Sequence, residues 1–115
     1  MFSVEYFNRA VIITAYNIRR INFRYQVNLR KLIVKAMKQS CDKVILNLVG
    51  VRQVDNCAFE MLKQMNKQTE NAGIQLCLLN LDNEIVDQIG ERVCELSDCL
   101  SEPEQLEEYV ELMAY

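Results

Sequence analysis

The sequence predicts an α/β protein: a mixed β-sheet of about four to five strands flanked by about four α-helices. Two observations lead to this fold class. Strand-like segments alternate with helix-like segments after an opening hairpin, an order that produces parallel strand pairs joined by right-handed crossovers. The inner strand-like segments are continuously apolar, which is typical of strands buried on both faces. With 115 residues, 50% hydrophobic and 25% charged, the chain fits one domain, and we expect residues 1–115 to form it.

The first elements are a hairpin and a basic helix. Residues 2–7 and 10–16 are rich in β-branched and aromatic residues, and the intervening Asn8-Arg9 offers a tight polar turn. Asn22 can cap a helix that runs to about Gln39. The apolar positions of this helix recur at helical spacing, at Tyr25, Leu29, Leu32, Ile33 and Ala36. The opposite positions are basic, at Arg24, Arg30, Lys31, Lys35 and Lys38.

The middle of the chain predicts strand, helix, strand. Residues 43–49 form a short apolar run that suits a central strand. Asp55 or Asn56 then caps a helix that reaches about Ala72, and Gly73 at the C′ position ends it. The apolar stripe of this helix consists of Phe59, Leu62, Met65 and Thr69. Residues 74–80 supply another buried strand.

The last quarter of the chain predicts two more helices. Asp82 opens a short helix that ends near Glu91, and an extended piece follows over residues 94–100. Ser101-x-x-Glu104 is a capping box with Pro103 inside the first turn, so a final acidic helix closes the sequence.

Charge is distributed unevenly along the chain, whose formal net charge is −3. Every charged residue from Arg9 to Lys43 is basic except Asp42, and after Arg92 every charged residue is acidic. Two interpretations stay open: the runs are solvated helix faces, or the basic run is a patch for an acidic partner or lipid headgroups. The negative balance argues against a nucleic-acid partner.

Composition also narrows the classes of function. The five cysteines form no CxxC pair and accompany no histidine, so neither a zinc site nor a disulfide framework is indicated, and a reducing compartment fits best. No Gly-rich phosphate loop or nucleophile motif is present, so we expect no enzyme activity and no cofactor. The sequence opens with strand-like alternation and contains no long apolar run, so we expect a cytoplasmic protein without an integral membrane segment.

One stretch carries a resemblance to a known family. Val44-Ile45-Leu46-Asn47-Leu48-Val49-Gly50-Val51 leads to Val54-Asp55-Asn56-Cys57 and then into a helix, a glycine break and a second apolar strand. In this order the chain resembles the STAS family (sulphate transporter and anti-sigma factor antagonist), whose members carry an Asp-Ser dipeptide at the helix start. The resemblance spans nearly the whole chain and implies a STAS-like fold and a non-catalytic, regulatory role. Three positions depart from the family pattern: Asn56 replaces the phosphorylated Ser, Cys57 a second Ser, and Ala58-Phe59-Glu60 the usual Gly-Leu-Gly.

The departure at Asn56 has a chemical consequence. A helix N-terminus favours a phosphate, and phosphorylation of the family's serine adds nearly two negative charges that repel a docked partner. Asn56 offers no hydroxyl and stays neutral, so we expect a domain fixed in its partner-competent state and not regulated by phosphorylation. The alternative is that Asn56 is only a helix cap. Cys57 is either a reactive thiol near a helix start or, as we favour, an inert one.

The resemblance also implies partners and contact residues. The expected partner-binding residues are Gln53, Asp55, Asn56, Cys57 and Phe59, with Phe59 divided between core and partner face. The expected partner is an anti-sigma factor of the histidine-kinase-like ATPase type, and the protein would be bacterial. The alternative is an accessory STAS subunit of an ABC-type lipid transport complex, whose partner would be an ABC ATPase subunit.

Overall fold

Four strands of the chain form one mixed sheet in a computed structural model that describes residues 1–92. The strands are β1 (Phe2–Phe7), β2 (Ala10–Ala15), β4 (Lys43–Asn47) and β6 (Gln75–Leu79), and they lie in the order β1-β2-β4-β6. The pair β1–β2 is antiparallel, whereas β2–β4 and β4–β6 are parallel. The mixed α/β fold predicted from the sequence is therefore confirmed.

The opening hairpin turns at Asn8 and Arg9. Both residues have positive φ, 45° and 65°, as in the type I′ turn, whose twist matches that of the flanking strands. The register places Phe7 opposite Ala10, directly across the two-residue turn. The predicted hairpin and its turn are thus present.

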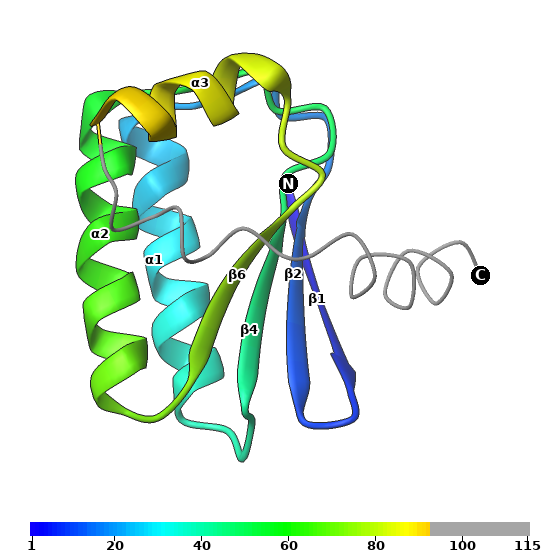
Figure 1. Cartoon of the computed structure of the whole chain (residues 1–115). Coiled ribbons are helices and arrows are strands. Elements are labelled where there is room, and N and C mark those ends of the chain that lie inside the picture. Colours follow the sequence, from blue (N-terminus) through cyan, green and yellow to red (C-terminus); the bar gives the residue numbers. More distant parts are fainter. Residues whose placement is uncertain (93–115) are drawn as a thin grey trace.

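Three helices complete the described part of the chain. Helices α1 (Phe23–Met37) and α2 (Asn56–Asn71) lie side by side over the same face of the sheet, and α3 (Asn83–Arg92) lies across one end of it (Figure 1). The Asn22 side chain caps α1 by accepting a hydrogen bond from the Tyr25 N–H at 3.1 Å, and Gly73, with φ 74°, follows α2 as predicted. The extended piece at 94–100 and the helix expected after Ser101 lie outside the described residues.

The core lies between the two long helices and the sheet. The predicted apolar stripe of α2 is buried in full, and the sheet meets it with side chains of alternating strand positions, among them Val11, Ile13, Val44, Leu46, Leu76 and Leu78. On the opposite face of the sheet a second buried cluster is formed by Ala10, Ile12, Ile45, Cys77 and Leu79. Strand β4 is therefore central and buried on both faces, which is why its sequence does not alternate.

A second, two-stranded sheet was not predicted. Strands β3 (Arg20–Ile21) and β5 (Gln53–Val54) pair in parallel, Arg20 with Gln53 and Ile21 with Val54. The Arg19 carbonyl accepts hydrogen bonds from the N–H groups of Arg52 and Gln53 at 2.8 and 3.1 Å, and the Ile21 carbonyl accepts one from Asp55 at 3.0 Å. Because β3 leads into α1 and β5 into α2, this short ribbon joins the two segments that enter the crossover helices.

Candidate partner-binding surface

The three strands β2, β4 and β6 run in the same direction and end at a common edge of the sheet, which we call the carboxyl edge. Strands β3 and β5, the starts of α1 and α2, and helix α3 all lie at this edge (Figure 1). Loops at the carboxyl ends of parallel strands are where open α/β sheets bind their ligands. The predicted partner-binding residues belong to this edge because they precede or begin α2.

Four of the five predicted residues lie at or near the surface of the carboxyl edge. Gln53 in β5 and Asn56, the first residue of α2, are exposed, and Asp55 and Cys57 are half-buried. The cap position of α2 is Asp55, not Asn56, because the helix begins one residue after Asp55. The interpretation of Asn56 as the helix cap is therefore wrong: its side chain stands in the first turn.

The Asp55 carboxylate does not cap α2 either. It makes no hydrogen bond to the first turn of the helix, and instead pairs with Arg20, whose Nε lies 2.6 Å from Asp55 Oδ1. The Asp55 side chain is 27% exposed and that of Arg20 63%, so solvent screens the pair in part. The pair fixes the direction of both side chains and adds a side-chain link to the ribbon formed by β3 and β5.

Phe59 does not belong to the surface. The side chain is 2% exposed and lies in the main core cluster under α2. A group this deeply buried cannot contact a partner unless the helix moves away from the sheet. The expectation that Phe59 contributes to a partner face is corrected here: it belongs to the core, where aromatic residues at helical spacing are usually found.

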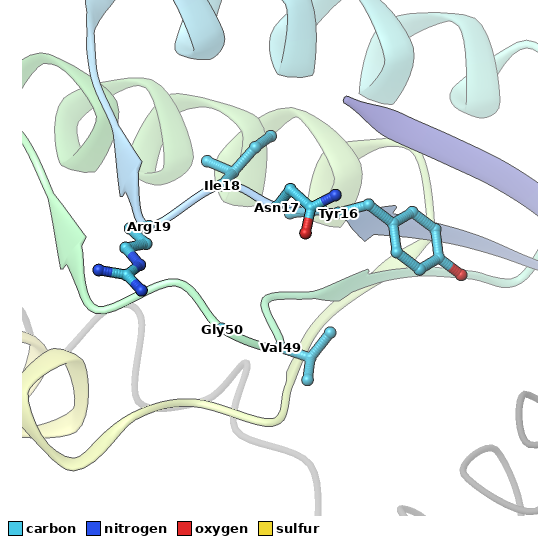
Figure 2. A pocket seen from close by; sticks show the side chains of 7 residues that line it. Tyr16, Asn17, Ile18, Arg19, Val49 and Gly50 are labelled. Atoms are coloured by element: carbon cyan, nitrogen blue, oxygen red, sulfur yellow. The ribbon is translucent and has the colours of Figure 1, made fainter.

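An open cleft of about 650 Å³ lies at the carboxyl edge, between the segment after β2 and the loop after β4. Figure 2 shows Tyr16 at one end of the cleft, Arg19 at the other, and Val49 and Gly50 along the facing loop. Asn17 and Gly50 both have positive φ, 56° and 82°, so both chain segments turn sharply here. The Arg19 carbonyl accepts hydrogen bonds from the N–H groups of Arg52 and Gln53. Strand β5 ends just before Asp55, so these bonds connect the cleft to the start of α2.

Exposed hydrophobic side chains gather at this same edge. Among the described residues, the large hydrophobic side chains with high exposure are Met1, Tyr6, Tyr16, Phe23, Val49 and Val86. All except Tyr6, which lies next to the hairpin turn at the other end of the sheet, belong to segments at the carboxyl edge. Phe23 is 68% exposed and Val49 47%, although both flank buried elements. Exposed apolar side chains at one end of the sheet make this edge a candidate interaction surface.

Sequence reasoning missed these hydrophobic residues. Tyr16 ends the second strand of the predicted hairpin and Val49 ends the predicted central strand, but β2 ends at Ala15 and β4 at Asn47. Phe23 follows the cap residue, outside the periodic stripe of α1. The signal that could have located them is an apolar residue just beyond a strand end and next to a Gly or Asn with turn potential.

The carboxyl edge offers side chains suited to binding. The described residues contain no group of three or more metal-ligating side chains that could hold a metal ion, and the chain has no histidine. The surface offers aromatic and aliphatic side chains, the Asn56 amide and the Arg20–Asp55 pair. Such a mixture of apolar side chains and a few oriented polar groups is typical of protein interfaces.

Comparison with known families identifies the chain. The family model described as STAS domain matches residues 10–99, which is well over half of the sequence. The chain therefore belongs to the STAS domain family. Among curated proteins no sequence match is found.

Solved structures of the same fold include an anti-sigma factor antagonist and an anion transporter. The anti-sigma factor antagonist SpoIIAA in its unphosphorylated form superposes with a TM-score of 0.74 at 16% identity, with 96% of both chains covered. The phosphorylated form of the Bacillus cell fate determinant SpoIIAA gives 0.70 at 17% identity, covering 96% of this chain and 99% of that one. The murine anion transporter Slc26a9 gives 0.66 at 20% identity over 84% of this chain and 16% of the transporter. At these identities the likeness is one of fold. No helix among residues 1–92 is long and apolar enough to cross a membrane.

Proposed function

We propose that the chain is a single-domain, non-catalytic regulatory module of the cytoplasm that binds a partner protein through its carboxyl edge. It would act as an anti-sigma factor antagonist does, with an anti-sigma factor of the histidine-kinase-like ATPase type as partner. The observation that carries the proposal is the gathering of exposed hydrophobic side chains at the edge where α2 begins. The likeness in fold to SpoIIAA, an anti-sigma factor antagonist, supports the choice of partner.

The proposed contact residues are Gln53, Asp55, Asn56 and Cys57, together with the exposed hydrophobic residues of the same edge. Apolar side chains would supply most of the binding free energy on desolvation. The exposed Asn56 amide would lie at the positive end of the α2 dipole. It is neutral and has no hydroxyl to phosphorylate, so the surface would stay in its binding state where a phosphorylatable relative switches off.

A pair of matched variants tests the surface. Val49→Asp places a charge among the exposed hydrophobic residues of the carboxyl edge, and Tyr6→Asp does the same at the opposite end of the sheet, where the side chain is 61% exposed. Each variant is mixed with an anti-sigma factor kinase of the same organism and analysed by gel filtration and calorimetry. We expect Val49→Asp to weaken the complex by about tenfold or more, because burying an unpaired charge costs about 1.4 kcal/mol or more. Tyr6→Asp should bind as the wild type does.

A second experiment addresses the missing switch. The wild-type chain, incubated with the kinase and ATP, should remain unmodified, whereas Asn56→Ser should be phosphorylated and then lose the partner. Asn71→Ser, at the exposed far end of α2, serves as a control for unspecific phosphorylation. Absence of any complex with the wild-type chain would contradict the proposal. Equal phosphorylation of Asn56→Ser and Asn71→Ser would contradict the assignment of Asn56 to the phosphosite-equivalent position.

The second candidate function is an accessory subunit of an ABC-type lipid transport complex. One observation favours it: the same fold occurs as part of a membrane transporter, the anion transporter Slc26a9. In this case the carboxyl edge would bind an ABC ATPase subunit in place of a kinase. Copurification of a tagged chain from its native membranes, followed by mass spectrometry, separates the two functions, since an ATPase of the ABC type supports the second and an anti-sigma factor the first.

A further inference from the structure

Helix α1 carries a surface that the proposed function does not use. Its charged residues are Arg24, Arg30, Lys31 and Lys35, the C-cap residue is Lys38, and none of the residues from Phe23 to Lys38 is acidic. The ion pairs of the described residues are Arg9–Asp42, Arg20–Asp55 and Lys63–Glu60, so none involves α1. Within residues 1–92 the positive charge of this helix is not balanced by an acidic side chain in salt-bridge distance.

The arrangement costs stability in the isolated domain. Lys31 and Lys35 are four residues apart and Lys35 and Lys38 three, so like charges face each other along one side of the helix. Like charges at a spacing of four residues destabilise a helix. Helix α2 is different, because Lys63 lies 3.8 Å from Glu60 at the favourable spacing of three residues. An anionic ligand bound along α1 would relieve the repulsion that residues 1–92 leave uncompensated there.

The same side of α1 forms a groove with an apolar floor. It has a volume of about 450 Å³, and besides the cations its walls contain Gln26, Val27 and Val34. Both valines are half-buried, while Arg30, Lys31, Lys35 and Lys38 are exposed. Val27 and Val34 are seven residues apart, which places them about 10 Å apart along the helix axis. The groove therefore combines a recessed apolar strip with a cationic rim.

We infer that this groove of α1 binds an acidic, amphipathic segment of a protein partner, at a site separate from the carboxyl edge. The cationic rim would pair with carboxylates, and the two valines would receive apolar side chains that recur every two helical turns. An anionic membrane is a poorer fit, because surface-bound helices insert protruding apolar residues. Here the two valines are half-buried. Neither belongs to the large hydrophobic side chains with high exposure among residues 1–92.

The test uses the full chain and a fluorescein-labelled synthetic peptide of about 15 residues, with glutamates on one helical face and leucines on the other. Fluorescence anisotropy measures its binding to the wild type, to Lys31→Glu/Lys35→Glu and to a matched control, Lys63→Glu/Lys67→Glu, which reverses two charges at the same spacing on α2. All four side chains are at least partly exposed, and circular dichroism checks that each variant is folded. A peptide with glutamine in place of glutamate, and vesicles containing phosphatidylglycerol, complete the set.

The expected result is saturable binding of the glutamate peptide that weakens at least tenfold in Lys31→Glu/Lys35→Glu, remains within about twofold in the α2 variant, and falls as salt is added. Val34→Ser should also weaken peptide binding, because the leucines of the peptide would lose an apolar contact in the groove. Binding of a simple anion would not depend on this contact. The inference is overturned if the glutamate peptide does not bind, if the two double variants lose binding equally, or if the glutamine peptide binds as well. Vesicle binding that depends on Lys31 and Lys35, without peptide binding, would assign the groove to lipid headgroups instead.

Discussion

Replacement of Phe59 by alanine should destabilise the domain strongly, although the sequence pattern allowed this residue a place at the partner surface. The ring is 2% exposed and packs in the main core cluster. Truncation of a buried Phe removes the favourable transfer of the ring out of water and leaves a cavity, which together cost about 3–4 kcal/mol. With a urea m-value of about 1.5 kcal/mol per M for a domain of this size, the midpoint of unfolding should fall by about 2 M.

Urea denaturation followed by circular dichroism measures this shift. Gln53→Ala, at an exposed position of the same region, should change the free energy of unfolding by no more than about 0.5 kcal/mol. Phe59→Leu should retain most of the stability and bind the partner as the wild type does, since the side chain does not reach the surface. A loss below about 1 kcal/mol in Phe59→Ala, or loss of partner binding in a folded Phe59→Leu, would refute the placement of this residue in the core.

Three further predictions concern the polar contacts. In a double-mutant cycle of Arg20→Ala and Asp55→Ala, measured by urea denaturation, the coupling should be about 0.5–1 kcal/mol, because the pair is short but partly exposed; a coupling of zero would mean that the pair does not link β3 to the start of α2. Asn22→Ala should cost about 1 kcal/mol through loss of the α1 cap, while Asn22→Asp should cost little, and equal losses for both would contradict the capping role. Arg9 lowers the pKa of Asp42 by a hydrogen bond and by its charge, so the stability of this pair is present above the ordinary pKa of an aspartate and is lost as the pH falls through the lowered value. In an NMR titration Arg9→Gln should raise the Asp42 midpoint, and an unchanged midpoint would disprove the interaction.

The elements that sequence reasoning located correctly are those with long, regular patterns. The fifteen-residue α1 and sixteen-residue α2 repeat their apolar positions over several turns, and Asn22 and Gly73 mark their ends by local chemistry. The continuous apolar run of β4 indicated burial on both faces, because a central strand with parallel neighbours has a covered layer on each side of the sheet. Strands β3 and β5 escaped prediction because two residues cannot display a period.

The candidate site was predicted only in part, for reasons that depend on tertiary contacts. The location of Gln53, Asp55 and Asn56 followed from the strand–turn–helix order, which local sequence determines. Which residue occupies the cap position did not follow, since Asp and Asn are equally good caps. Nor did local sequence indicate that the Asp55 carboxylate pairs with Arg20, 35 residues away in sequence. The exposure of Phe23 and Val49 likewise depends on which elements cover the strand ends.

The ribbon of β3 and β5 has a mechanical consequence for the carboxyl edge. The backbone hydrogen bonds donated by Arg52, Gln53 and Asp55, together with the Arg20–Asp55 pair, connect the two chain segments that enter α1 and α2. A ligand that displaces one segment must break these bonds or carry the other segment with it. A displacement of the segment beside Asn56 is therefore coupled through these contacts to the start of α1, beside Phe23.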